Sequence, residues 1–207
     1  MPEQPLARLS HVTALNLPDT WAAVPNVATN DRAWTGDVAA TLCDGAQAQA
    51  LVAAKLAEAH SEMISEAHVV VGVWVPDRVL PDIAGMFFLD WVVPTDDGLE
   101  VNRRTYRSLL DPDCRTDHVT YRRMLKELDV PAGPALLVHE VIARPLKSWK
   151  RIVQENITYT VFPRGCSDAV TLAFVSFAPE FGDVLAHDAE VGVNSLRLAL
   201  AQPQWSS

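Results

Sequence analysis

Two strand-length segments of the chain, 67–75 and 86–93, are apolar on both of their alternating faces. In the first, Val71 and Val73 share one face of an extended chain, whereas Trp74 lies on the other. A strand without a polar face has to be covered on both sides. The sequence therefore predicts a sheet with packing layers on both faces. A chain of 207 residues is long enough to bury such a core without disulfide staples.

Two segments have the periodicity of amphipathic helices. Residues 46–65 carry apolar side chains at helical spacing, and Asp44 followed by Gln47 predicts a capping box at the start of this helix. A closing helix is expected to begin at Asp183 and to continue its apolar stripe as far as Leu200.

The remaining segments complete one α+β domain over residues 1–207. Further strands are expected at 8–17, 38–42, 135–143, 152–162 and 169–177. Irregular structure is expected at 18–37, a hairpin partner at 99–101, a helical segment at 103–129, and flexible tails at 1–8 and 202–207. The order of these elements predicts a mainly antiparallel sheet flanked by helices, an arrangement like an α/β/α sandwich.

Composition and cysteine usage favour a cytoplasmic protein. The first residues contain no apolar stretch of the kind found in a signal peptide, and no window has the length and hydrophobicity of a membrane span. The three cysteines, Cys43, Cys114 and Cys166, form no Cys-x-x-Cys pair, so reduced thiols are expected. Cys114 is the one expected to be least buried, and a neighbouring arginine favours its thiolate.

The sequence lacks the motifs of the common enzyme classes. It has no glycine-rich phosphate loop, no Gly-x-Ser-x-Gly elbow and no His-Glu-x-x-His, so no cofactor, metal or catalytic residue is predicted. An acidic loop cluster is interpreted as loop capping, because it lacks the glycine and final glutamate of a calcium loop; its members are Asp111, Asp113, Asp117 and His118. His139 and Glu140 are adjacent on an expected strand, where they face opposite sides and need different partners.

Charge is distributed unevenly along the chain. Residues 103–151 contain eleven lysines and arginines and six acidic residues, which gives this segment a net charge of +5. The whole chain has a net charge of −9, so the remaining residues together carry −14. This split predicts a basic surface that binds an acidic protein or a second copy of the chain, whereas two solvated faces are the alternative. The residues expected on this surface are Arg103, Arg104, Arg107, Arg122, Arg123, Lys147, Trp149 and Lys150. Nucleic acid is disfavoured because the acidic remainder repels phosphate.

Two further hypotheses compete with the basic surface. A small-molecule-binding protein or enzyme would have an apolar aromatic pocket between sheet and helices, lined by Trp74, Phe87, Trp91 and His139. A homodimer formed through the sheet edge is a third possibility.

The last third of the chain resembles a known family. The strand segments 134–138, 154–162 and 170–174, followed by Ser176, Pro179 and a closing helix, are similar to the PsbP-like α/β/α sandwich. This group includes the extrinsic photosystem protein, a Ran-binding nuclear transport factor and bacterial LpqN-like proteins. The resemblance implies a non-enzymatic protein that acts by binding another macromolecule.

Overall fold

A computed structural model of the protein describes residues 6–27, 33–65, 68–94, 101–110, 119–147 and 150–201. The first elements in chain order are β1 (Arg8–Ala14), β2 (Trp21–Val24), α1 (Ala33–Leu42), α2 (Ala46–Met63), β3 (His68–Trp74), β4 (Gly85–Val92) and α3 (Arg103–Leu109). They are followed by β5 (Val119–Val130), β6 (Gly133–Lys147), β7 (Lys150–Val161), β8 (Ala169–Ser176), the 3₁₀ turn η2 (Pro179–Phe181), α4 (Gly182–Ser195) and β9 (Arg197–Ala201).

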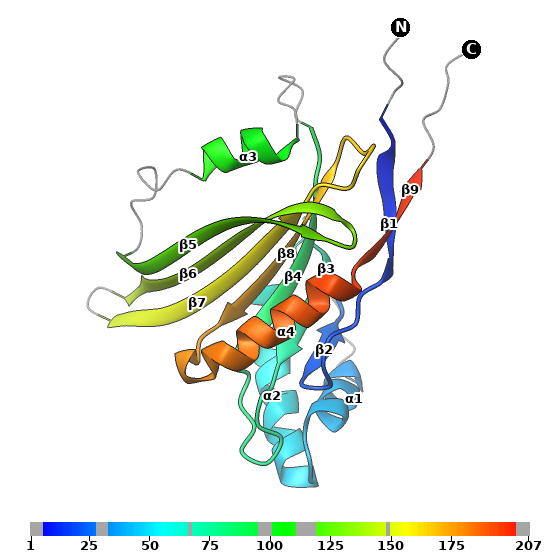
Figure 1. Ribbon diagram of the computed structural model, residues 1–207. Helices are drawn as coiled ribbons and strands as arrows, with labels where there is room; N and C mark the ends of the chain where they lie inside the picture. The colour runs from blue at the N-terminus through cyan, green and yellow to red at the C-terminus, as the bar shows by residue number, and fades with distance from the viewer. Residues whose placement is uncertain are drawn as a thin grey trace, which may run out of the picture.

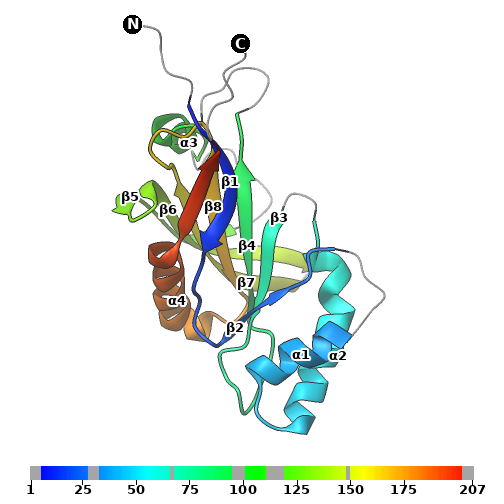
Figure 2. The same ribbon diagram turned by 90° about the vertical axis from the view of Figure 1, so that its right-hand side faces the viewer.

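An antiparallel sheet of seven strands organises the α+β fold. Its order is β2-β3-β4-β8-β7-β6-β5, so β2 and β5 are the edge strands (Figure 1). The first and last strands, β1 and β9, pair with each other in a separate two-stranded ribbon. In both views, α3 and this ribbon lie toward one end of the molecule, and α1, α2 and the segment between β3 and β4 lie toward the other (Figures 1 and 2).

Helices cover both faces of the strands for which the sequence predicted two covers. On one face, Trp74 and Phe87 pack with Trp21, Phe174 and the buried side of α4. On the other face, Val71 and Val73 of β3 pack against α1 and α2, which lie to one side of the sheet in Figure 2. A smaller cluster joins α3 to the first residues of β6 and β8. The prediction that β3 and β4 are enclosed on both sides is confirmed.

The helix predicted over 46–65 is α2, but its start differs from the prediction. Gly45 is the N-cap residue, with a φ of 87° and no side-chain hydrogen bond to the first turn. The Asp44 carboxylate instead contacts Arg78, with Oδ1 3.5 Å from Nη2. The predicted capping box is therefore wrong: the positive φ of Gly45 turns the chain, and the carboxylate faces the β3–β4 loop.

Two segments have a different secondary structure from the one predicted. Residues 38–42 are the end of α1, whose buried residues Thr35, Ala39 and Leu42 recur at helical spacing. Within the described residues of 103–129, which exclude 111–118, α3 is helical and the segment from 119 onward belongs to the edge strand β5 (Val119–Val130). Pairing with β6 along its length holds this polar segment extended, although its composition favours a helix.

The ends of the chain are also more ordered than predicted. The closing helix stops at Ser195, and the residues after it turn away to form β9. At the other end, the Ala7 N–H donates to the Gly165 carbonyl, and Arg8 begins β1. Ala7 and Arg8 are thus not part of a tail, whereas 1–5 and 202–207 lie outside the described residues. The segment 18–37, expected to be irregular, contains β2 and the start of α1.

The strands predicted in the last third are confirmed as β6, β7 and β8, with β6 longer than expected at both ends. The hairpin partner expected at 99–101 lies mostly outside the described residues, and Val101 is in coil before α3.

Candidate functional site

The residues predicted to form one basic surface are divided between two faces of the sheet. Arg122 and Arg123 are neighbours on β5, so their side chains lie on opposite sides of it. Arg123 shares its face with Glu140, its register partner on β6. Lys147 and Lys150 are register partners at the far end of the β6–β7 hairpin, and Trp149 lies outside the described residues.

On the α3 side of the sheet, the arginines are paired with acidic side chains. Arg103 Nε lies 3.3 Å from Glu127 Oε2, and Arg107 binds the other oxygen of the same carboxylate. Arg123 Nε lies 3.7 Å from Glu140 Oε2, and its Nη2 donates to the Leu110 carbonyl over 2.7 Å. These contacts attach α3 to β5 and β6. Of the cations predicted on α3, Arg104 and Arg107 are exposed and Arg103 is half-buried.

On the opposite side, β5 and β7 present exposed cations and exposed apolar groups. Met124 opposes His139 in register, so residues 122, 124 and 126 of β5 lie on the face that α4 covers further along the sheet. On β7, the alternation places 151 and 153 on this same face. We call it the open basic face, and it consists of Arg122, Met124, Lys126, Arg151 and Val153.

Of the predicted residues whose side chains the structure describes, Arg122 is the one on the open basic face. Lys126 and Arg151 were counted among the eleven cations of 103–151 but were not assigned to the predicted surface. For Lys126 the reason is that the helical interpretation of 103–129 gave β5 the wrong period. The alternation of Arg122, Met124 and Lys126 is the sequence signal that identifies the face, since residues two apart share one side of a strand. Met124 and Val153 are each 37% exposed, so the face offers apolar contact area as well as charge.

His139 and Glu155 form a buried pair beside this face. His139 Nε2 and Glu155 Oε1 are 2.6 Å apart, and the side chains are 17% and 8% exposed. The predicted division of His139 and Glu140 between different partners is confirmed, because Glu140 lies on the other face with Arg123. The start of α4 packs against this pair: a Cβ on Gly182 would lie 2.5 Å from Glu155 Oε2.

A histidine–carboxylate pair can move a proton, but the hydroxyl nearest to it in register has other bonds. Ser176 opposes Glu155 across β7 and β8. Its Oγ lies 3.3 and 3.2 Å from the Ala84 and Ala178 carbonyl oxygens, which share its one O–H as acceptors, and it accepts from the Ala178 N–H at 3.0 Å. The geometry of Ser176 is that of a structural hydroxyl that closes a turn.

The predicted aromatic pocket is replaced by packed core at two of its four positions. Trp74 and Phe87 are fully buried; Trp74 stacks on Trp21 with ring centroids 5.4 Å apart. Trp91 is half-buried against the same core. A groove of about 600 Å³ does open between the 12–17 segment and β2–β3, and Phe87 and Trp21 reach its floor.

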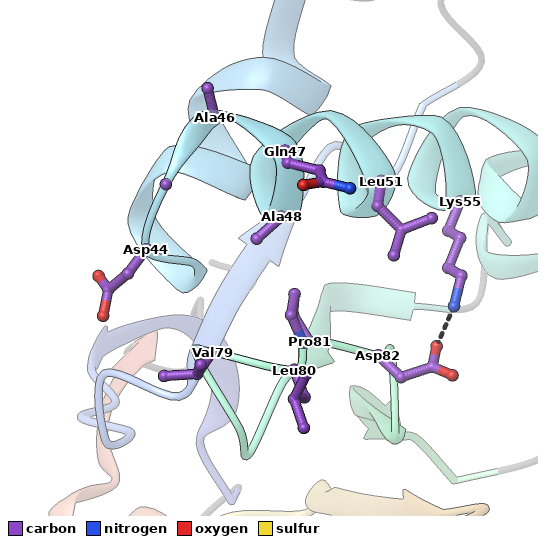
Figure 3. A pocket seen from close by; sticks show the side chains of 11 residues that line it. Asp44, Ala46, Gln47, Ala48, Leu51, Lys55, Val79, Leu80, Pro81 and Asp82 are labelled. Atoms are coloured by element: carbon purple, nitrogen blue, oxygen red, sulfur yellow. Dashed lines mark hydrogen bonds and ion pairs between the residues drawn. The ribbon is translucent and has the colours of Figure 1, made fainter.

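A second groove, of about 690 Å³, lies between the first half of α2 and the β3–β4 loop (Figure 3). Leu51 projects from α2 on one side, and Val79 and Leu80 form the tip of the loop on the other. An ion pair closes one end, with Lys55 Nζ 2.6 Å from Asp82 Oδ1. No sequence pattern marks this groove, because its two walls are separated along the chain by β3.

The cysteines and the acidic loop cluster add no reactive or metal-binding site to the part of the chain that the structure describes. Burial raises the pKa of the Cys43 and Cys166 thiols, and both are free. Within the described ranges, no three His, Cys, Asp or Glu residues are grouped as metal ligands. The predictions for Cys114 and for the cluster Asp111, Asp113, Asp117 and His118 fall outside these ranges. None of the described helices combines the length and hydrophobicity needed to cross a lipid bilayer.

Because the comparisons with protein families and curated proteins found no match, this protein is classified by its fold alone. No protein-family model matches the chain, and no curated protein matches it. The chain is an α+β protein with a mainly antiparallel seven-stranded sheet flanked by helices.

Proposed function

We propose that this protein is a non-enzymatic accessory protein that binds an acidic protein partner through the open basic face. The observation that carries the proposal is the set of three cations on strands that α4 leaves uncovered. Arg122, Lys126 and Arg151 are exposed there, and the carboxylate of Glu155 beside them is buried against His139. A basic face on a chain of net charge −9 attracts an acidic partner by a local field.

The exposed aliphatic side chains on the same face support protein binding. Met124 and Val153 supply apolar area between the cations, and stable interfaces combine an apolar centre with a charged rim. The proposed setting is the cytoplasm, with no cofactor. The similarity of the last third of the chain to PsbP-like binding proteins is in agreement with this role.

Binding of a fluorescent oligo-glutamate peptide tests the proposal directly. We expect measurable binding at low ionic strength that weakens as salt screens the charges. The triple variant Arg122→Glu, Lys126→Glu and Arg151→Glu should weaken it by at least about tenfold. The matched control is Arg104→Glu, Arg144→Glu and Arg164→Glu, which changes net charge equally at exposed sites off this face.

Equal loss of binding in the two triple variants would show that net charge alone attracts the peptide. Absence of binding by the wild type would also reject the proposal. Circular dichroism of each variant establishes that it is folded before binding is compared.

Small-molecule binding is the second candidate function, and the groove floored by Phe87 and Trp21 favours it. The groove volume, about 600 Å³, falls within the range of ligand sites. Fluorescence of 1-anilinonaphthalene-8-sulfonate tests this candidate: Val70→Trp, which fills the groove, should abolish an enhancement that Val69→Trp on the other side of β3 preserves.

A further inference from the structure

The β3–β4 loop presents two large aliphatic side chains to solvent at its tip. Val79 is 74% exposed and Leu80 80% exposed, and Leu51 of α2, which lines the same groove, is 49% exposed. Single exposed aliphatic residues are common, but three around one groove form a patch of the kind that marks an interaction site. The contact area therefore consists of a groove wall and a projecting tip.

The tip has a defined conformation. Asp77 Oδ1 accepts hydrogen bonds from the N–H groups of Val79 and Leu80 at 2.8 and 3.0 Å. These bonds fix the backbone that carries the two side chains, so less conformational entropy is lost when a partner binds. The hydrogen bonds to Asp77 therefore form a turn within the loop that stabilises the conformation of its tip.

The charge around the patch determines which partner fits it. Hollows of about 690, 400 and 370 Å³ surround the loop, and Asp82 lines all three. Their linings contain five carboxylates and one ammonium group, Lys55: the carboxylates are Asp44, Glu58, Asp77, Asp82 and Glu180. Arg78, which lines none of the three hollows, pairs with Asp44 and Asp19. An acidic segment is repelled here, whereas a basic one is attracted.

The ion pair at the groove end leaves a carboxylate available to a partner. Lys55 and Asp82 are 37% and 70% exposed, and ion pairs so open to water contribute only about 0–1 kcal/mol. A lysine or arginine from a partner can therefore share Asp82 at little cost. Asp44, at the opposite end, is similarly exposed.

We propose that the groove between α2 and the β3–β4 loop docks a short segment of a partner protein in which an aliphatic or aromatic residue is flanked by lysine or arginine. The apolar residue packs between Leu51 and Leu80, and its cationic neighbours contact Asp44 and Asp82. This surface lies at the end of the molecule away from α3 and the β1–β9 ribbon, on other elements than the open basic face (Figures 1 and 2). It is independent of the proposed function.

A random-peptide phage library selected on the immobilised full-length protein tests the proposal. We expect enriched peptides to combine leucine, phenylalanine or tryptophan with adjacent lysine or arginine. The most enriched peptide, synthesised with a fluorescent label, should bind in anisotropy titrations and weaken with increasing salt. Leu80→Ser and Asp82→Lys should each weaken it by at least about tenfold.

Matched substitutions elsewhere on the surface distinguish specific binding in this groove from nonspecific hydrophobic or electrostatic binding. Leu109→Ser removes another exposed leucine, and Asp129→Lys reverses another exposed carboxylate; both should leave the titration unchanged. Leu80 and Asp82 are exposed, so their variants are expected to fold, which circular dichroism verifies.

Several results would overturn the proposal. These are enrichment of no peptide, enrichment of acidic peptides, equal binding by the groove variants, and occupation of the groove by a second copy. Sedimentation velocity detects the last of these as self-association that Leu80→Ser abolishes.

Discussion

At the scale of single residues, Asp188 is a buried carboxylate that joins β2 to α4. Its Oδ2 accepts from Trp21 Nε1 at 2.8 Å and from Thr20 Oγ1 at 3.3 Å. Asp188→Ala leaves the buried indole N–H without this acceptor and should lower the free energy of unfolding by about 1–3 kcal/mol. Urea denaturation measures the loss; Asp188→Asn, which keeps an acceptor oxygen, and His187→Ala, at an exposed position, should lose less.

The conformation of the β3–β4 loop is expected to depend on pH, because the Asp77 carboxylate accepts hydrogen bonds from the loop backbone. Hydrogen bonds from the N–H groups of Leu80 and Val79 hold the pKa of its carboxyl below the usual value. Because the folded pKa is lowered, the stabilisation is complete above the unfolded pKa, about 3.9, and is lost as pH falls through the folded pKa. The amide proton shifts of Val79 and Leu80 should therefore titrate with a midpoint below about 3.9.

Asp77→Asn is the control for this titration, because the amide oxygen still accepts both bonds but does not ionise. The inflection should disappear in this variant. A midpoint at or above the usual aspartate pKa in the wild type would contradict the prediction.

Some contacts of individual residues at the site could be predicted from the sequence, and others could not. Strand alternation was sufficient to separate His139 from Glu140. The partner Glu155 could not be inferred, since that contact depends on the register in which β6 pairs with β7. In the same way, Arg122 was predicted, but its neighbours Lys126 and Arg151 on the open basic face required the strand assignment of β5 and its alignment with β7.

At the scale of elements, Gly85 shows how closely β4 and β8 approach beneath Trp74. A Cβ at this position would lie 2.3 Å from the Val175 carbonyl oxygen and 3.1 Å from Trp74 Cε3. Gly85→Ala must displace backbone, so we expect a loss of about 1–3 kcal/mol in the free energy of unfolding. The matched substitution Gly36→Ala in α1 meets no atom within 4 Å and should stabilise by up to about 1 kcal/mol. Equal midpoints in urea for these two variants would refute the packing argument.

The elements that sequence reasoning misassigned are those whose structure depends on distant partners. α1 has buried residues only where α2 and β2 meet it, so its short apolar run also fitted a strand. β5 is polar enough to suggest a helix, and pairing with β6 overrides that local preference. The strands β3, β4 and β8, by contrast, are so apolar that they could be predicted from their own sequences.

At the scale of the whole molecule, the basic residues of 103–151 are clustered along the sequence, but the fold places them on opposite faces of the sheet. The net +5 of residues 103–151 includes arginines that attach α3 to the sheet through Glu127 and Glu140 as well as cations that face solvent. A one-dimensional charge count cannot distinguish these two roles, because an edge strand distributes neighbouring residues between opposite faces. The two covered faces of the sheet, however, were predictable from β3 and β4 alone.

The β1–β9 ribbon joins the two ends of the chain over the core. Leu9 pairs with Leu200 in register, and Leu9 and Val12 pack against the cluster beneath α4. Arg8 Nε lies 2.7 Å from the buried carboxylate of Asp168. Because these contacts span nearly the whole sequence, no local pattern could predict them.

Removal of β1 should therefore destabilise the whole molecule. Deletion of residues 1–14 exposes the apolar area that Leu9 and Val12 cover and leaves Asp168 without its cation. We expect a loss of more than about 3 kcal/mol in the free energy of unfolding, measured by urea denaturation. Deletion of residues 1–5, which precede β1, is the control and should change stability little. If both deletions unfold at the same urea concentration, the ribbon is an appendage, and the core beneath α4 is stable without it.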